Sequence, residues 1–476
     1  MTDPEFEQCT YLEGSPLEDF AKVDLGDTRR NQRLMDIISA LENTPAQSFP
    51  DAVNGDPARL EGLYRFFGND HVTVQQLLAP HLRSTLKRSE ALGCIYAVHD
   101  SSDLTFESRQ GEHHRKNLEV SGKYTQTLHL HATLAVSADG NAVPLGVLGM
   151  MTWAQTEEDV VTRPPQWKKS ARWLEQALAV EQIRPEELQI IDVMDREADF
   201  YALLKEMNRH KKRYIIRMLH DRNVAHEEAA TIVSAVANEP VCGRRKIVVG
   251  ARRANRRSTS DKRKHPPRKK RLAHIGVRRA TLVVEKPIRR SKKDDPNLVI
   301  NVVEVVEYNP PKNETPISWY LLTTEPIKTE ADCWRVVDGY RARWTIEEYF
   351  KCLKTGCGVE SRQLKSREAL ERMLGIMMPL SWRLLLMRDL ARSPLARQSA
   401  QIIFSDTELV VLSSAVPHCQ MGESPTLEEA LYATAALGGH LRQSGPPGWL
   451  TIWRGFRQLQ DRHEGYLMGI QRSVEG

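Results

Sequence analysis

One short segment carries residues whose chemistry suits a site that acts on phosphate. In an α-helix of about 3.6 residues per turn, one face of this segment presents four such side chains: Tyr340, Arg343, Glu347 and Lys354. A metal held by Glu347 would act on a phosphodiester while the phenol, the guanidinium and the ammonium hold the strand. The same charge spacing also fits an exposed helix stabilised by ion pairs, so the rest of the chain must decide between the two interpretations.

The flanking residues predict that this segment is one helix from about 330 to 355. Thr329 is followed three residues later by Asp332, which is a helix start of the capping-box kind. Gly356 and Gly358 follow Lys354 closely and supply a stop.

A metal site for phosphoryl transfer needs further carboxylates, and a first candidate is Asp100. It ends an apolar run, 94–100, that is typical of a buried strand. The residues at 101–103 predict a turn directly after it. A rigid sheet would hold such a carboxylate well, although an aspartate in this place is also a common turn former.

A second candidate is Asp195, at the end of the apolar run 188–195. Asp192 lies three residues earlier, so strand alternation turns it to the opposite face. Asp195 is therefore the better ligand candidate of the two. Taken alone, it also fits a helix cap, because a helical pattern follows it.

The carboxylates and the spaced helix residues together resemble the IS4 family of DDE transposases, and the resemblance extends over most of the chain. Near the start, the segments 24–34 and 61–67 resemble the DNA-binding region of that family. Near the end, the segments 437–439 and 453–456 resemble its dimerisation region. The resemblance implies an RNase H-like catalytic core of the α/β class and a homodimer in a synaptic complex.

The resemblance also implies a role for each site residue. The residues that would bind two Mg²⁺ ions, or Mn²⁺ as a substitute, are Asp100, Asp195 and Glu347. The residues that would grip the DNA strand that is not transferred are Tyr340, Arg343 and Lys354.

Three further DNA contacts are implied by position. Trp319 matches a tryptophan that stacks on a flipped base, although a strand aromatic buried in the core is an equally good interpretation. Arg217 and Arg222 fall where the family places contacts after the second strand. Leu219 stands between them where a lysine is expected, which puts the phosphate grip there in doubt.

A chain of 476 residues is long enough for roughly three domains. We predict a helical DNA-binding domain, an RNase H-like domain and a helical dimerisation domain at 1–72, 73–375 and 376–476. Apolar and β-branched runs predict strands of a β insertion, at about 240–325, in the segments 245–249, 280–284 and 298–303. Helix 426–437 suits pairing with a second copy, or packing on its own domain.

The charge distribution agrees with double-stranded DNA as the partner. The net charge is only +5, but basic residues cluster between Arg244 and Lys293, where they would attract a polyanion by releasing counterions. The same run fits a solvated loop, and we expect disorder at 254–271 in the absence of DNA. In the first domain, the residues that could contact phosphates and base edges are Arg29, Arg30, Arg33 and Arg65.

Other residues limit the classes of protein to consider. Seven cysteines without a C-x-x-C pair argue for a reducing compartment and against a disulfide frame or a zinc site. Together with the family resemblance, this predicts a nucleoid-associated protein of the bacterial cytoplasm. His129 and His131 have a spacing that can bind metal, but an ordinary polar strand face is favoured. The most apolar stretch, 373–387, is too short to span a bilayer and predicts a kinked core helix at 373–390.

The function predicted from the sequence is cut-and-paste DNA transposition by two-metal phosphoryl transfer. By the resemblance, the steps are a nick at the element end, formation and opening of a hairpin, and joining to target DNA. Two alternatives remain: an inactive or inhibitory copy that only binds ends, and a metal-dependent nuclease that never joins strands. A hydrolase unrelated to nucleic acid is disfavoured by the basic segment.

Overall fold

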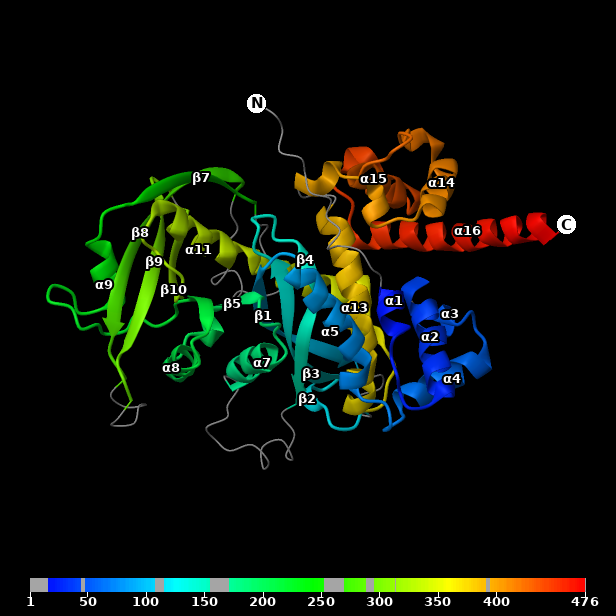
Figure 1. Ribbon diagram of the computed structural model, residues 1–476, viewed down its shortest axis with the longest axis horizontal. Helices are drawn as coiled ribbons and strands as arrows, with labels where there is room; N and C mark the ends of the chain where they lie inside the picture. Colours follow the sequence, from blue (N-terminus) through cyan, green and yellow to red (C-terminus); the bar gives the residue numbers. More distant parts are fainter. Residues whose placement is uncertain are drawn as a thin grey trace. The chain divides into compact units, whose positions relative to one another are not determined.

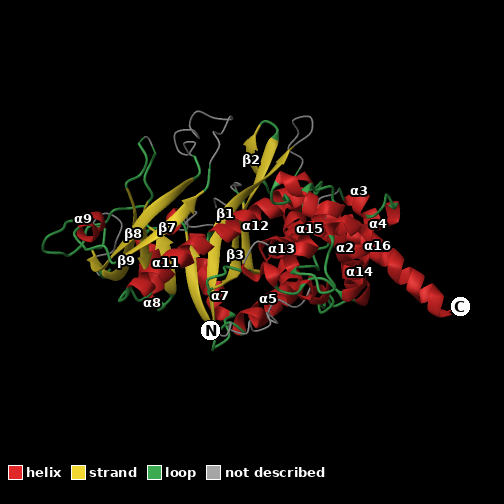
Figure 2. Cartoon of the chain, turned by 90° about the horizontal axis from the view of Figure 1, so that it is seen from above, coloured by secondary structure: helices red, strands yellow, loops and turns green. Residues whose placement is uncertain are grey.

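The computed structural model describes residues 16–43, 48–107, 115–154, 171–251, 269–287, 295–312, 314–390 and 394–475. The chain divides into two compact units, whose elements are shown in Figures 1 and 2. Unit 1 comprises Met1–Lys168, Leu178–Gln189 and Trp344–Gly476, and unit 2 comprises Lys169–Ala177 and Ile190–Arg343. Both units mix helices with strands, which confirms the predicted α/β class. The division into three domains stays a prediction.

The sheet of unit 1 is antiparallel and is organised around strand β3 (Thr125–Ser137). β3 pairs with β1 (Cys94–Glu107), with β2 (Glu119–Gly122) and with β4 (Pro144–Trp153). Almost every residue of β3 is buried, and apart from Gln126 its sequence consists of apolar residues, serine, threonine and two histidines.

Strand β1 does not stop at Asp100, so the turn predicted at 101–103 is wrong. Ser101 lies opposite His131 and Asp103 opposite His129 in the same ladder. The physical reason lies in the next residues: Leu104 and Phe106, two apart, are both buried, and this alternation continues the strand.

Helices cover the sheet of unit 1. α5 (Val74–Glu90) and α13 (Arg367–Leu390) pack against β4 and against each other. α13 is buried along nearly its whole length, as predicted for a core helix. In the described residues before α5 the helices are α1 (Pro16–Phe20), α2 (Thr28–Asn43), α3 (Phe49–Ala52) and α4 (Pro57–Phe67). Among the helices described, none combines the length and the hydropathy that a membrane span requires.

The end of the chain forms a helical cluster with α14 (Asp406–Ala415), α15 (Leu427–Leu437) and α16 (Trp449–Glu475). α15 packs against α14 and α16 within unit 1, as Figure 1 shows, which is the second of the two arrangements considered for this helix. Two glycines let α15 and α16 touch through their backbones. A Cβ on Gly438 would overlap the carbonyl oxygen of Thr451, and a Cβ on Gly455 would overlap that of Thr434.

The strands of unit 2 follow the order β5 (Gln189–Met194), β6 (Arg213–Arg217), β10 (Ser318–Thr323), β9 (Leu298–Tyr308), β8 (Arg271–Val284) and β7 (Gly243–Val249). β5 and β6 are parallel and the other neighbours are antiparallel. The strands predicted for the β insertion are therefore confirmed. The helices here include α8 (Tyr201–Arg209), α9 (Ile232–Ala237) and α11 (Glu330–Ala342).

The segment predicted as one helix at 330–355 is divided into three pieces. The start is as predicted, because Thr329 and Asp332 form a capping box. α11 then ends at Ala342, where the amide of Arg343 donates to the carbonyl of Tyr340 over a tighter span than an α-helix uses. α12 covers Trp344–Lys351, and a π-helical turn covers Cys352–Gly356.

Strand alternation in β5 buries an ion pair in unit 2. The Asp192 carboxylate lies 3.1 Å from the Lys212 ammonium, and both side chains are almost completely excluded from solvent. A carboxylate in such a place is stable only while its partner remains.

We expect Lys212→Met to lower the free energy of unfolding by about 3 kcal/mol, because it removes the opposite charge that lies beside the buried Asp192 carboxylate. Urea unfolding followed by circular dichroism measures this loss. Lys205→Met is the matched control: Lys205 pairs with Asp295 at a partly exposed site, so its loss should cost at most about 1 kcal/mol. Equal effects of the two variants would contradict the buried-pair interpretation.

Candidate active site

Asp195 stands directly after β5 and begins a 3₁₀ turn, Arg196–Ala198. Its Oδ1 accepts the backbone N–H of Glu197 at 2.7 Å, so it is a helix cap, which was the alternative to a ligand. Burial raises the pKa of the Asp195 carboxyl above its usual value, although that hydrogen bond and the Arg343 guanidinium act in the opposite direction. A desolvated carboxylate that keeps an unfavourable charge is one that a bound cation would stabilise.

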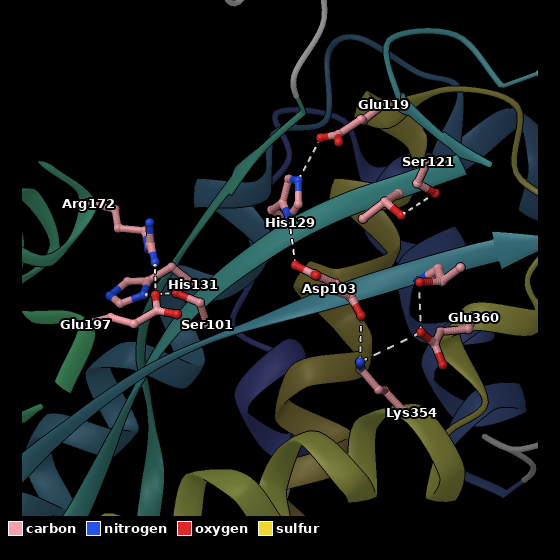
Figure 3. Close-up of polar contacts among 12 residues, drawn as sticks. Ser101, Asp103, Glu119, Ser121, His129, His131, Arg172, Glu197, Lys354 and Glu360 are labelled. Carbon is pink, nitrogen blue, oxygen red and sulfur yellow. Dashed lines mark hydrogen bonds and ion pairs between the residues drawn. The ribbon is translucent and has the colours of Figure 1, made fainter. Parts of the chain in front are cut away.

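Arg172 supports the same turn and was not found from the sequence. It lies in α7 (Ala171–Gln182), and its guanidinium contacts the Glu197 carboxylate at 2.6 Å (Figure 3). The Arg172 side chain is only 8% exposed, whereas the Glu197 side chain is 66% exposed, so the buried guanidinium meets a carboxylate that stays open to solvent. Glu197 in turn donates its amide to Asp195, which links α7 to the turn that carries the candidate ligand.

Asp199, four residues after Asp195, organises the loop after β6. Its Oδ2 accepts the backbone N–H groups of Leu219 and His220, at 2.5 and 2.8 Å. Its Oδ1 lies 2.6 Å from the Arg222 guanidinium. Arg222 therefore has a structural partner in unit 2, and its role as a DNA contact stays a prediction.

The expected DNA contacts of unit 2 include a cluster of rings and guanidinium groups. The Trp319 ring meets the Tyr340 ring edge to face, with centroids 5.6 Å apart. The Arg217 guanidinium lies 5.6 Å from the Trp319 centroid, and the Arg343 guanidinium 5.9 Å from that of Tyr340. Trp319 is half-buried at a partly exposed end of β10, so it is not a core aromatic. This cluster joins four of the predicted contacts in one place.

The charges of this cluster favour the binding of an anion. Burial lowers the pKa of Arg217, and repulsion from Arg196 and Arg343 acts in the same direction, although Tyr340 opposes it. Cations held close together in a partly desolvated place gain when a phosphate joins them. The arrangement therefore suits a phosphodiester beside an aromatic face.

Two predicted ligands, Asp100 and Glu347, belong to unit 1. Asp100 lies in the middle of β1 opposite Ala132, and its Oδ1 accepts the N–H of Ser101 at 2.8 Å. Glu347 lies on α12, which packs against β1. Both side chains are partly buried.

Lys354, the last of the four spaced residues, lies in the π-helical turn of unit 1. Its ammonium donates to the backbone carbonyl of Asp103 at 2.5 Å and lies 3.8 Å from the Glu360 carboxylate (Figure 3). Sequence analysis predicted Lys354 but neither of these partners.

The two histidines of β3 make ordinary polar contacts. Both ring nitrogens of His129 lie within hydrogen-bond distance of carboxylates, at 2.6 Å from Asp103 and 2.8 Å from Glu119. His131 contacts the hydroxyl of Ser101 at 2.9 Å. These contacts favour the polar strand face over a histidine metal site.

The described residues contain no group of three or more histidine, cysteine or acidic side chains arranged to hold a metal ion. Asp100 and Glu347 are in unit 1 and Asp195 is in unit 2. Their carboxylate oxygens are nevertheless the donors that Mg²⁺ and Mn²⁺ prefer, and the desolvation of Asp195 fits a cation.

The amino-terminal arginines differ in their exposure to solvent and in the contacts that their guanidinium groups already make. Arg29 on α2 is 95% exposed, whereas Arg30 donates to the carbonyl of Leu25. The guanidinium of Arg33 lies against Gly62, and Arg65 pairs with the neighbouring carboxylate of Glu61 in an exposed contact.

Three arginines in the described part of the basic segment form ion pairs within unit 2. Arg245 contacts Asp338 at 2.7 Å, and Arg271 and Arg278 contact Glu307 and Glu304, each at 2.8 Å. The clusters at 252–268 and 289–290, and most of the segment predicted to be disordered, lie outside the described residues.

Two family models match the chain. A model described as Transposase DNA-binding matches residues 17–72, and one described as Transposase DDE domain matches residues 157–380. The first match contains the four amino-terminal arginines, and the second contains Asp195 and Glu347. Asp100 precedes the second match. The α/β fold described above is consistent with an RNase H-like DDE domain.

We expect Asp195→Asn to stabilise the protein at pH 7 in the absence of divalent metal. The raised pKa means that the folded chain binds the Asp195 proton more tightly than the unfolded chain does. Stability is therefore lost as the pH rises from the ordinary aspartate value through the raised one, and asparagine avoids that loss. Thermal unfolding in EDTA between pH 4 and pH 8 should show a gain at neutral pH that fades in acid.

Asp199→Asn is the matched control for that experiment. It lies in the same segment, but its carboxylate is fully used by two amides and Arg222, so the variant should lose about 2 kcal/mol. A loss of stability at pH 7 in Asp195→Asn as well would contradict the assignment of Asp195 as a functional carboxylate.

Proposed function

We propose that this chain, a DDE transposase by its DNA-binding and DDE domains, carries out cut-and-paste transposition as a member of the IS4 family similar to the Tn5 transposase. The observation that carries the proposal is the cluster of Arg217, Trp319, Tyr340 and Arg343 in the unit that also holds Asp195. A site that only hydrolyses small phosphates has no need of two aromatic rings beside the phosphate grip.

In the proposed mechanism the metal ligands are Asp100, Asp195 and Glu347. Two Mg²⁺ ions bound there would activate water or a 3′-OH and stabilise the leaving oxygen. The protein's own contribution begins with Asp195, which the Glu197 amide holds in one orientation at the end of a rigid strand. No side chain needs to act as a covalent nucleophile.

The aromatic and guanidinium cluster handles the DNA strand that is not transferred. Arg217 and Arg343 would bind its phosphates, and the hydroxyl of Tyr340 would add a donor. Trp319 would stack on a base displaced from the duplex, which stabilises the strained hairpin that the freed 3′-OH forms. The partial exposure of Trp319 supports this role, because a fully buried ring could not meet a base.

The remaining parts of the proposal concern assembly. The helices of 17–72 would bind the transposon ends, with Arg29 the most exposed of their candidate contacts. A homodimer would hold two ends together in the bacterial cytoplasm. Support for the dimer comes from α16, whose last turns expose large apolar side chains: Tyr466, Leu467, Met468 and Ile470.

The test is an excision assay with purified protein, Mg²⁺ and a supercoiled plasmid carrying an element flanked by its own candidate inverted ends. Wild type should release a hairpin-ended fragment and form joined product. Asp195→Ala should bind the ends but give neither product. Binding without cleavage by the wild type, with Mn²⁺ also tried, would support an end-binding copy, and cut but unjoined ends would support a nuclease.

We further expect Glu347→Gln to abolish nicking, hairpin formation and joining, because glutamine keeps the shape but removes the charge that holds the metal. Its affinity for the ends, measured by gel shift, should stay within about twofold of wild type, since the charge is far less important for binding than the arginines are. Surviving cleavage would make the neighbouring Glu348 the candidate. Glu348 is paired with Arg388 at 2.8 Å, so Glu348→Gln serves as the adjacent control.

A further inference from the structure

Two charged side chains of unit 1 take the place of a neighbouring strand along part of β1. The ammonium of Lys354 donates to the carbonyl of Asp103 at 2.5 Å, and Glu360 accepts the N–H of Thr105 at 2.8 Å. The ammonium and the carboxylate are 3.8 Å apart, so they also form an ion pair (Figure 3). We call this group, consisting of Lys354, Glu360 and the two backbone groups, the clip.

The clip occupies one edge of β1. In a β-strand the backbone groups of successive residues face opposite edges, so the groups of Asp103 and Thr105, two residues apart, face the same edge. An unpaired carbonyl and N–H there would lose free energy if water were excluded. A lysine donor and a glutamate acceptor satisfy both groups, as the N–H and C=O of a partner strand would.

The clip also connects the two segments of unit 1 that carry candidate metal ligands. Asp100 lies three residues before Asp103 on the same strand, and Glu347 lies seven residues before Lys354 on the segment that packs against β1. Among the described hydrogen bonds, the one from Lys354 to the Asp103 carbonyl is the bond that joins the Lys354 side chain to the backbone of β1.

The turn that presents Lys354 is anchored in the core of unit 1. The N–H of Cys357 donates to the carbonyl of Cys352 at 2.9 Å, which closes the π-helical turn. Ser381 of α13 donates its hydroxyl to the sulfur of Cys357 at 3.0 Å and accepts from the sulfur of Cys352 through its carbonyl at 3.3 Å. The backbone around Lys354 is therefore fixed, and the clip fixes its flexible end.

We propose that Glu360 is a positioning residue for DNA cleavage: it holds Lys354 on the edge of β1 and so fixes the Glu347 segment beside the strand of Asp100. This inference rests on the proposed function. Lysine has a flexible four-carbon stem, and holding it in one rotamer lowers the entropy cost of reaching the cleavage geometry once DNA is bound. An ammonium has three N–H donors, so donors remain for a phosphate after the Asp103 carbonyl has taken one.

The experiment compares Glu360→Ala with Glu360→Gln, Lys354→Met and the double variant Glu360→Ala/Lys354→Met. End affinity is measured by fluorescence anisotropy, and cleavage by single-turnover assays with protein in excess. The matched control is Glu368→Gln, because Glu368 accepts a hydrogen bond from the distant Asn117 in the same unit but has no contact with Lys354.

The expected result is a loss in the cleavage rate and not in binding. Glu360→Ala should slow cleavage by about 10- to 100-fold, the scale of a misplaced catalytic segment, with end affinity within about twofold of wild type. The double variant should be no slower than Lys354→Met, because Glu360 acts through Lys354. Wild-type cleavage by Glu360→Ala, or losses that multiply in the double variant, would overturn the proposal.

Hydrogen exchange at the Thr105 amide tests the clip without any activity. Glu360→Ala removes the acceptor, so exchange there should become at least about tenfold faster, whereas Glu360→Gln keeps an oxygen acceptor and should stay close to wild type. If the wild type never cleaves DNA, the proposed function has failed, and hydrogen exchange alone then tests whether Glu360 binds the Thr105 amide. Unchanged exchange in Glu360→Ala would overturn it.

Discussion

The pairing of β1 with β3 is the constraint on which unit 1 depends. The ladder runs without a break from Ile95 opposite Ser137 to Glu107 opposite Thr125. Because the register is continuous, backbone hydrogen bonds fix Asp100 opposite Ala132 of β3. The backbone position of this candidate ligand is therefore set by the sheet, while the N–H of Ser101 contacts its carboxylate.

In unit 2, two aspartates of one short segment have different surroundings. Asp195 and Asp199 are four residues apart, yet their surroundings differ in kind. Asp199 receives two amides and an arginine, which makes its charge a part of the structure. Asp195 receives a single amide and is desolvated, so its charge is left poorly compensated. That difference separates a residue that maintains a loop from one that is ready to bind a cation.

Local patterns predicted the features that depend on neighbours in the chain. The capping box at Thr329 and the strands of the β insertion follow from such patterns, and so does the position of Asp195 after a strand. The extension of β1 beyond Asp100 was missed because serine and aspartate favour turns when tertiary pairing is ignored. Arg172 and Glu360 could not be predicted as partners, since they contact residues 25 and 255 positions away. The prediction that the three candidate carboxylates form one metal site came from the family resemblance, because their spacing in the sequence does not predict it.

The backbone contact between α15 and α16 has a genetic consequence. At Gly438 and Gly455 a single added carbon would overlap a carbonyl oxygen of the facing helix. Every amino-acid replacement of glycine adds at least that carbon, so no missense change at either codon leaves the helix pair as it is. Random missense changes at these two positions would therefore disrupt the packing of α15 and α16, although neither glycine belongs to the candidate active site. Such codons can inactivate the protein as effectively as changes in its candidate metal ligands.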